Sequence, residues 1–428
     1  MPVRPFAASL HCACVPLCRS TLLLLVLSGL VLTTTAVTAD ERSREPSPLT
    51  RHHGKLDEES GASAAVVVAD TPLLHTKQFL PLDDTGKVLH SGATERQFDH
   101  VWQQLETLLA RHPGAELVKL NLYVAGNDAA DTVRKALQPR LKERRRAAVS
   151  FVVTRLPGGA DVHVALDAVV ALPASKPVTG ENQDANSVAI HGEQESTVAS
   201  VMPPGRRVYI SGQAEKASGL ASATRETLES LDRTLQFLKL DRRRDVVQIK
   251  AFLHPMSEVA TVYEEVAKFF PSGRIPPVVV VEWESSLPIE IEMIAHGGPA
   301  VAEGPLLEYL TPPGMTASPV FSRLARINRG PSLYISGLYG SQPEANEEVT
   351  PLFGKLTEIL GDTGSDLKHL AKATYYVATD EVSTALNQLR PRYYDPARPP
   401  AASKAQVQGV GQKNRNLTID MIAVPREE

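Results

Sequence analysis

Apolar and polar positions alternate in a recurring order along this chain, and the order predicts the same set of elements three times. The segment VYISGQ at 208–213 recurs as LYISGL at 333–338 and, more faintly, as VLHSGA at 88–93. Strict alternation over such short lengths predicts strands. After each Ser-Gly pair the apolar residues change to three- and four-residue spacing, which predicts an amphipathic helix. Each copy therefore begins with a hairpin that leads into a helix.

A strand that carries a lysine follows each predicted helix. The strands read LVKLNLYV from 117, VQIKAFL from 247 and LAKATYYV from 370. A second helix comes next, and two further strands close each copy, the last with an acidic residue near its middle. The aligned lysines are Lys119, Lys250 and Lys372, and the aligned acids are Asp167, Glu292 and Asp420. Because the lysines repeat, we expect them to be structural and to pair with an acid such as Asp245 or Asp366.

The length of the repeat decides the domain organisation. The serines of successive Ser-Gly pairs lie 120 and 125 residues apart, which is long enough for a complete domain. We therefore expect three tandem domains rather than a solenoid of short repeats. The predicted domains are 63–173, 196–296 and 315–428, and the segments 174–195 and 297–314, which lack apolar periodicity, are predicted linkers.

Strand pairs at both ends of each unit, with only two helices between them, predict an α+β fold. Each unit should form a mixed β-sheet with two helices on one face. The other face must also be buried, because VVVVEW at 278–283 is apolar on both sides. Three units in one chain can bury these faces against each other. We therefore expect a monomer that is an intramolecular pseudo-trimer.

The first 39 residues have the pattern of a secretory signal peptide. They contain Arg4 and Arg19, no acidic residue, and an apolar run at 22–32 followed by small residues. This run of about 11 residues falls short of the ~20 that span a bilayer, so an uncleaved anchor is the alternative. Cleavage after Ala39 predicts an exported protein, periplasmic or extracellular, with no membrane attachment. Residues 40–62 are charged and aperiodic, and are a predicted flexible leader.

Composition excludes several classes of function. The three cysteines, at positions 12, 14 and 18, precede the apolar run, so the mature chain has no disulfide and no thiolate nucleophile. A net charge of -4 gives no general attraction to nucleic acid. The twelve histidines are scattered, and the chain contains neither a Walker loop nor a Gly-x-Ser-x-Gly elbow. We therefore expect no metal, no cofactor and no nucleic-acid partner.

The order of elements, with YISG and the terminal IEIEMIA at 289–295, resembles the Rid family of reactive intermediate deaminases, also called YjgF or L-PSP proteins. The resemblance covers roughly residues 63–428 and is clearest in the third unit. It implies the chorismate-mutase-like fold of that family, whose members are usually homotrimers with a small-ligand site in each cleft between neighbours. It also implies binding of imines, enamines or 2-oxo acids, with an activity like that of 2-iminobutanoate/2-iminopropanoate deaminase.

The resemblance implies an incomplete catalytic site. The family arginine that clamps the ligand carboxylate corresponds to Ala402, and our alignment places Val278 and Ala148 there in the other units. The family glutamate that positions water is matched by Glu290, which is either the catalytic residue or an outward charge on an edge strand. Thr418 replaces this glutamate in the third unit.

Other residues are candidates for ligand binding. Arg144, Arg274 and Arg398 each precede a vacated clamp position by four residues, and either replace the clamp or are solvated loop residues. Asn387 matches a family asparagine, and Phe321 keeps the ring of a family tyrosine. The Ser-Gly pairs either bind the ligand through the backbone or provide a glycine where the strand bends. These pairs are Ser91-Gly92, Ser211-Gly212 and Ser336-Gly337.

Three alternatives to imine hydrolysis follow. A protein with degenerate Rid clefts could bind ligands without turnover or act as a scaffold. The same fold could act on a different cyclic substrate. An L-PSP-type endoribonuclease is disfavoured, because the sequence shows no His pair or Lys-His constellation for acid–base chemistry on phosphate.

Overall fold

The computed structural model describes residues 47–53, 61–173, 187–189, 195–270, 275–340 and 344–427. The predicted signal peptide at 1–39 and the candidate clamp Arg274 lie outside these residues. None of the described helices is long and apolar enough to span a bilayer.

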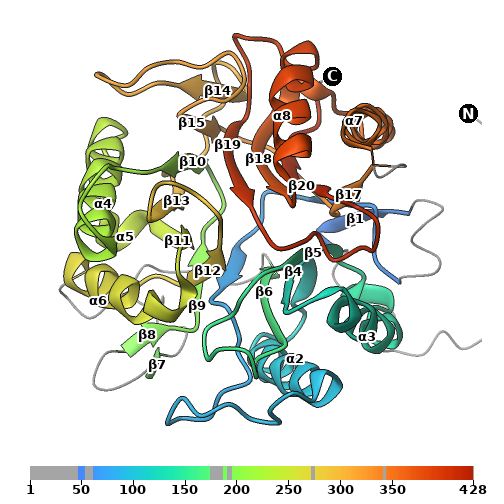
Figure 1. Ribbon diagram of the computed structural model, residues 1–428. Helices are drawn as coiled ribbons and strands as arrows, with labels where there is room; N and C mark the ends of the chain where they lie inside the picture. Colours follow the sequence, from blue (N-terminus) through green and yellow to red (C-terminus); the bar gives the residue numbers. More distant parts are fainter. Residues whose placement is uncertain are drawn as a thin grey trace, which may run out of the picture. The chain divides into compact units, whose positions relative to one another are not determined.

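Three mixed sheets make up the described chain, and each has the same central order of strands (Figure 1). The first sheet has the order β5 (Ala148–Val153), β4 (Glu116–Val124), β6 (Val164–Ala171), β3 (Leu73–Thr76) and β9 (Ala199–Met202). The second has the order β12 (Val278–Glu282), β11 (Val246–Leu253), β13 (Ile289–His296), β10 (Arg207–Gln213), β15 (Leu324–Ile327) and β14 (Leu307–Leu310). The third has the order β1 (Leu49–His52), β2 (Ala65–Val68), β16 (Ser332–Ile335), β20 (Leu417–Ala423), β18 (Leu370–Val377) and β19 (Ala401–Gln406), with β17 (Leu338–Tyr339) also paired to β20. A separate ribbon joins β7 (Ser187–Ala189) to β8 (Glu195–Thr197).

Two long helices pack on one face of each sheet, as the sequence predicts. The pairs are α2 (Thr94–Ala110) with α3 (Asn127–Leu137), α4 (Leu220–Phe237) with α6 (Val259–Phe269), and α7 (Ala345–Asp362) with α8 (Asp380–Leu389). A short helix α5 (Arg242–Asp245) precedes β11, and single 3-10 turns occur at η1 (Gln138–Arg140), η2 (Glu143–Arg145), η3 (Met256–Glu258), η4 (Leu367–His369) and η5 (Arg390–Arg392).

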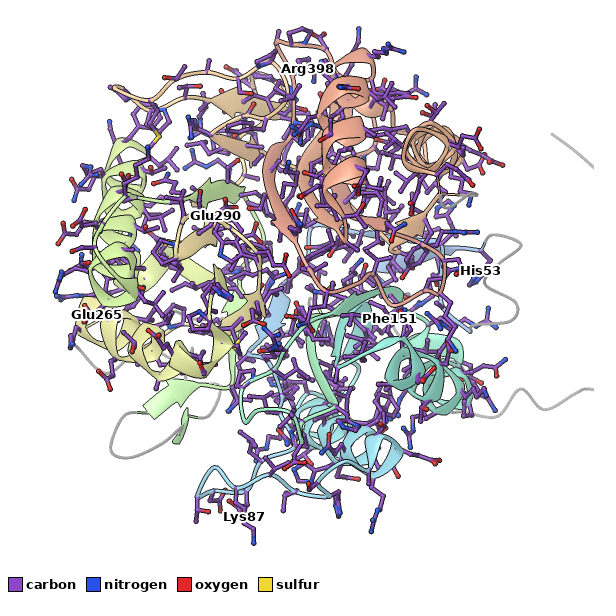
Figure 2. The ribbon with its side chains drawn as sticks, viewed as in Figure 1. His53, Lys87, Phe151, Glu265, Glu290 and Arg398 are labelled. Atoms are coloured by element: carbon purple, nitrogen blue, oxygen red, sulfur yellow. The ribbon has the colours of Figure 1, made fainter. Side chains whose placement is uncertain are left out.

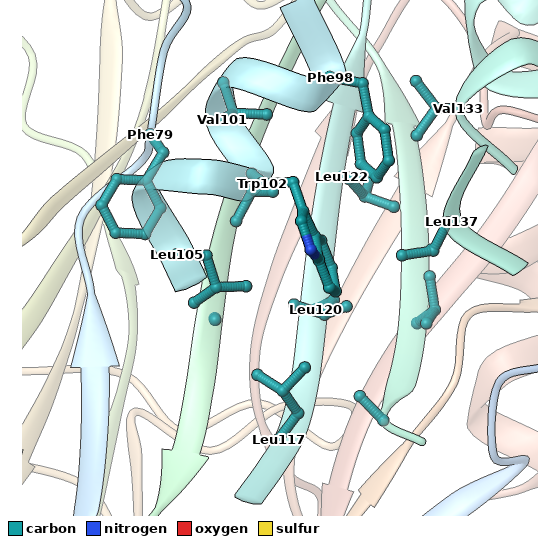
Figure 3. Close-up of a cluster of buried hydrophobic side chains, with 14 of the residues drawn as sticks. Phe79, Phe98, Val101, Trp102, Leu105, Leu117, Leu120, Leu122, Val133 and Leu137 are labelled. Carbon is teal, nitrogen blue, oxygen red and sulfur yellow. The ribbon is translucent and has the colours of Figure 1, made fainter. Parts of the chain in front are cut away.

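The helix–sheet core of the first unit shows why the helical spacing is amphipathic (Figure 3). Phe98 and Trp102 project from α2 at four-residue spacing and pack against Leu120 and Leu122 of β4. Val133 of α3 closes the same cluster. Burial of each such side chain contributes about 1.5–3 kcal/mol. The summed burial of these side chains stabilises the packing of α2 and α3 on this face of the sheet.

The opposite face of each sheet is buried against the other sheets. One apolar cluster contains Val169 of the first unit, Tyr209 and Ile294 of the second, and Tyr334 and Ile422 of the third. The predicted burial of both sheet faces is therefore confirmed. A sheet with two apolar faces needs such a second layer, because neither face tolerates water.

The first strand of each unit pairs with the sheet of a different unit. Strand β9 of the second unit adds to β3, β15 of the third unit adds to β10, and β2 of the first unit adds to β16. The three exchanges form a closed cycle that links every sheet to another unit by backbone hydrogen bonds.

Buried lysine–carboxylate pairs connect the units in the same cyclic sense. Lys119 Nζ of the first unit lies 2.8 Å from Asp420 Oδ1 of the third. Lys372 Nζ of the third unit lies 2.8 Å from Glu292 Oε1 of the second. Both lysines are largely buried, so each charge requires its partner. The predicted structural role of the lysines is therefore confirmed for these two.

Lys250 is misaligned in the sequence analysis, because strand register places Gln248 at the position of Lys119 and Lys372. Burial opposes the charge of Lys250, but nearby negative groups, Asp167 of the first unit among them, outweigh burial and raise its pKa.

The acids expected from the sequence as lysine partners are also wrong. Asp245 binds Arg244, and Asp366 contacts a neighbouring histidine. The partners of Lys119 and Lys372 are instead Asp420 of β20 and Glu292 of β13, and each acid comes from a different sheet than its lysine.

The structure corrects three assignments of elements. The segment 88–93 is a loop, and the strand that pairs like β10 and β16 is β3. Residues 49–52 of the predicted flexible leader form β1, which pairs with β2. The predicted linker 297–314 contains β14, which pairs with β15. In the last two cases a short segment gains a strand partner in a sheet.

Candidate functional site

The Ser211-Gly212 pair lies where the second unit meets β19 of the third, and we call this junction the 2–3 seam. Ala402 N donates a hydrogen bond of 2.7 Å to Ser211 Oγ, which itself donates to Ser322 O at 2.5 Å. Gly212 N donates to Ser403 Oγ at 3.2 Å. Both residues of the pair therefore join the two units, and the Ser211 hydroxyl is committed to this junction.

Glu290 of β13 lies directly over Gly212 (Figure 2 labels Glu290). A Cβ atom at Gly212 would lie 1.9 Å from Glu290 Oε1, so any larger residue there would displace the Glu290 side chain. Oε1 is buried without a hydrogen-bond partner among the described residues. Burial raises the pKa of Glu290 to about 7; the Ser403 hydroxyl opposes this rise and the charge of Glu292 adds to it. A carboxyl group with a free buried oxygen and a pKa near neutrality can exchange a proton with a ligand.

Lys404, which the sequence analysis missed, faces the same seam from the third unit. Its Nζ donates to Ser383 Oγ at 2.8 Å and to Asn387 Oδ1 at 3.3 Å. Burial lowers the pKa of Lys404, while the charge of Glu290 raises it, so the two charges are close enough to interact. Lys404 lies two residues after Ala402 in β19, and alternation along that strand could have identified it. Asn387, a predicted ligand residue, is thereby brought to this seam.

Phe321 lies just before β15, at the start of the third unit. The guanidinium carbon of Arg323 lies 5.1 Å from the centre of the Phe321 ring. Arg323 O accepts a hydrogen bond from Ser211 N, which connects this segment to the 2–3 seam. Arg323 Nε donates to Thr316 O, so this guanidinium is already partly bound.

The second Ser-Gly pair joins the third unit to β5 of the first, at the 3–1 seam. Ser336 Oγ accepts from Val149 N at 2.8 Å and donates to Ser63 O at 2.7 Å. Gly337 N donates to Val149 O at 2.9 Å. A Cβ atom at Gly337 would lie 3.1 Å from Thr418 Oγ1. Thr418 thus occupies the position that Glu290 has in the 2–3 seam.

An aromatic residue fills the lysine position of the 3–1 seam. Strand register aligns Phe151 with Lys404. The guanidinium carbon of Arg134 lies 4.7 Å from the centre of the Phe151 ring, and Arg134 donates to Gly411 O at 2.8 Å. The carboxylate and the lysine of the 2–3 seam are therefore both replaced here.

At the 1–2 seam a glutamine occupies the glycine position. Gln78 N donates to Val278 O at 3.2 Å, as Gly337 N does to Val149 O. The Gln78 side chain also donates to Val280 O at 3.1 Å. Ala165 stands at the position of Glu290. Ser91 and Gly92, predicted for this unit, lie in an exposed loop instead.

No contact among the described residues brings Arg398 to a seam. Arg398 lies 5.9 Å from the centre of the Tyr309 ring, and Figure 2 shows it well apart from Glu290. Arg144 is in η2, and Arg274 lies outside the described residues.

The clamp position of the first unit is shifted by one residue from our alignment. Val149 N donates to Ser336 Oγ as Ala402 N does to Ser211 Oγ, so Val149 is the counterpart of Ala402 there. In the second unit Val278, whose carbonyl accepts from Gln78 N as that of Val149 does from Gly337 N, keeps the position that our alignment gave it.

Within the described residues, no group of three or more His, Cys, Asp or Glu side chains could hold a metal ion.

Comparison with models of protein families and with curated proteins finds no match. Solved structures do match. A Rid-family protein of unknown function from Yersinia pestis is 19% identical and covers 29% of this chain and 99% of its own, with a TM-score of 0.26. A YjgF-family protein from Neisseria meningitidis is 19% identical and covers 28% of this chain and 97% of its own, with a TM-score of 0.22. A YjgF/YER057c/UK114-family protein from Mycobacterium tuberculosis is 20% identical and covers 24% and 86%, with a TM-score of 0.21.

Each of these solved chains corresponds to a part of this protein about as long as one predicted unit. The chain is an α+β protein with three mixed sheets. The predicted α+β fold, three mixed sheets with two long helices on each, is confirmed. What the seams do chemically is a separate question that rests on their residues.

Proposed function

We propose that the 2–3 seam binds small 2-imino or 2-oxo acids and hydrolyses the imines to 2-oxo acids and ammonia. The observation that supports this most is the pair formed by Glu290 and Lys404. They come from different units, the charge of each shifts the pKa of the other, and one oxygen of Glu290 is buried without a hydrogen-bond partner among the described residues. An unsatisfied buried carboxyl oxygen costs about 1–3 kcal/mol or more, and a ligand or a bound water can relieve this cost.

The chemistry follows from the charges of the two groups. Lys404 attracts the ligand carboxylate as a point charge, with Asn387 beside it. Glu290 accepts a proton from a water molecule as the water oxygen bonds to the imine carbon. Glu290 gives this proton to the imine nitrogen, which completes a neutral carbinolamine. The carbinolamine hydroxyl then loses its proton to Glu290 as the C–N bond breaks and the carbonyl forms. Glu290 passes that proton to the departing nitrogen, and ammonia and the 2-oxo acid leave.

A second proposal, ligand binding without turnover, is supported by the other two seams. Gln78 and Phe151 occupy the positions of Gly212 and Lys404 there. A chain that has replaced these groups in two seams could have lost turnover in the third as well. Under this proposal 2-oxobutanoate raises the melting temperature of the protein, but no ammonia is released from imines.

Ammonia release from 2-aminoacrylate, which tautomerises to 2-iminopropanoate, distinguishes the two proposals. Under the first, wild-type protein releases ammonia above the buffer rate, and Glu290→Gln lowers kcat about 100-fold or more, because acid–base groups contribute 10²–10⁴. The activity should rise between pH 6 and 8, as Glu290, with a pKa of about 7, ionises. Lys404→Met should mainly raise KM.

Glu284→Gln is the matched control, since Glu284 is an exposed carboxylate close to the end of β12. This variant should keep wild-type activity. Ammonia release that is unchanged in Glu290→Gln would refute the catalytic role of Glu290. If the protein shows no ammonia release and no thermal shift with 2-oxobutanoate, both proposals are refuted.

We also propose that the protein is exported and acts as a monomer. The apolar run at 22–32 supports export. The closed cycle of strand exchange among the three units supports a monomer, because the sheets are completed within one chain.

A further inference from the structure

A cavity of about 370 Å³ lies at the opposite end of β13 from Glu290. Its wall includes His296 at the end of β13, the residues of α5 at the start of β11, and Ser200 of β9. Strands rise about 3.4 Å per residue, so His296 and Glu290 are about 20 Å apart. The cavity is therefore separate from the 2–3 seam. Volumes of about 300–1,000 Å³ are typical of small-molecule sites.

Three consecutive arginines of α5 line this cavity. Asp245 binds Arg244 with two hydrogen bonds, of 2.8 and 2.9 Å, and so fixes and neutralises it. Arg242 lies 3.3 Å from Asp232 and its guanidinium carbon lies 4.2 Å from the centre of the Phe269 ring. These contacts hold two of the three guanidinium groups in place.

Arg243 differs from its neighbours. Its backbone N donates to Asp241 Oδ1 at 2.8 Å, which sets the turn. Its guanidinium forms no hydrogen bond or ion pair with the described residues, and the residue is exposed. The cavity wall thus carries three guanidinium groups and one carboxylate, an excess of positive charge next to apolar proline and valine side chains.

We propose that this cavity binds a small organic oxyanion, a carboxylate or a phosphate ester, through Arg243 and Arg242. Guanidinium groups present planar pairs of N–H donors that match the oxygen spacing of both anions. Arg244, held by Asp245, shapes the cavity rather than binding the anion. His296 can add a hydrogen bond at the rim, and the proline and valine side chains can cover the carbon part of the ligand.

The cavity also spans two units, because Ser200 belongs to the edge strand of the first sheet and α5 leads into the second. A bound anion should therefore stabilise the junction of the two sheets. Binding to the folded state alone raises stability in proportion to RT ln(1 + [L]/Kd). A rise in melting temperature then reports occupancy without any activity assay.

The test is titration of the mature chain with inorganic phosphate and, separately, with succinate, followed by calorimetry and by melting temperature. We expect saturable binding of at least one probe, weakened about 10-fold in Arg243→Gln and restored in part in Arg243→Lys, because one charge-assisted hydrogen bond contributes about 1.5–3 kcal/mol. Arg233→Gln, an exposed arginine on α4 outside the cavity, is the matched control and should bind like wild type.

The two probes identify the ligand class. Binding of phosphate alone assigns a phosphate ester, and binding of succinate alone assigns a carboxylate. No saturable binding of either probe, or equal affinity in wild type and Arg243→Gln, overturns the proposal. Ammonia release at the 2–3 seam should be unchanged in Arg243→Gln, so this result is independent of the proposed catalytic function.

Discussion

The stability of the protein should fall on mild acidification because of one buried histidine, His75 in β3. The residue is fully buried, and neither ring nitrogen has a hydrogen-bond partner among the described residues. Strand register places it where the other units carry Tyr209 and Tyr334. The charged group that faces it is Arg207, which is itself buried and bound to Asp70. A proton on His75 would therefore add a second positive charge to a dry interior.

Burial, with a smaller effect of Arg207, lowers the pKa of His75 from 6.5 to about 4. One pKa unit corresponds to about 1.4 kcal/mol, so this difference corresponds to about 3 kcal/mol. Because the folded-state pKa is the lower one, the unfolded chain binds the proton first. The contribution of neutral His75 to the free energy of unfolding is therefore fully present above pH 6.5. It is lost as the pH decreases from 6.5 to 4, and His75 causes no further loss below pH 4.

Urea unfolding of wild type and His75→Gln at pH 7.5, 5.5 and 4.5 measures the effect, because other groups titrate alike in both proteins. We expect the free energy of unfolding of wild type to fall more than that of the variant, by about 1 kcal/mol at pH 5.5 and about 3 kcal/mol at pH 4.5. His75→Phe should behave like His75→Gln. Parallel pH curves for wild type and both variants would refute the reasoning.

Three further predictions concern the seams and the assembly. Lys372→Met leaves Glu292 buried and unpaired, and should lower the free energy of unfolding measured in urea by about 3–5 kcal/mol. Adding Glu292→Leu should recover part of this loss. A loss under about 1 kcal/mol would contradict the buried pair. Gly212→Ala forces Glu290 aside and should cost about 1–3 kcal/mol and weaken 2-oxobutanoate binding, whereas Gly126→Ala, with no atom within 4 Å of the added Cβ, should keep the binding. Light scattering should give a monomer of 46.3 kDa, or less after removal of the signal peptide; a mass three times larger would exclude the intramolecular pseudo-trimer.

The alternation of apolar residues predicted the sheets and helices well, because burial on both faces of a strand depends on local sequence. For residues such as Leu120 and Ile249, the apolar pattern of their own strand is enough to predict that they are buried in the core. The first unit was misaligned because its equivalent of Tyr-Ile-Ser-Gly begins at His75 and lacks both the serine and the glycine. A string search then selected 88–93 instead.

The partners of short strands could not be predicted from the sequence. Strand β2 has four residues and could pair with the following β3 as a hairpin, but it pairs with β16 of the third unit. Which edge it joins depends on how the sheets pack, and no local pattern encodes that. Glu290 was identified from its motif, and strand alternation after Ala402 could have identified Lys404. The contacts of Lys404 with Ser383 and Asn387 depend on how α8 packs and could not be predicted from the sequence.

The differences among the three seams follow from joining the units in one chain. In a homotrimer each substitution appears at every interface, so a glutamine at the glycine position would close all three sites together. Here Gln78 affects only the 1–2 seam, and Phe151 only the 3–1 seam. The buried pairs Lys119–Asp420 and Lys372–Glu292 each hold two units together, and breaking either one leaves a buried charge. Separate copies therefore allow the seams to diverge while these two pairs are kept, and Glu290 with Lys404 marks the seam at which the charged groups remain.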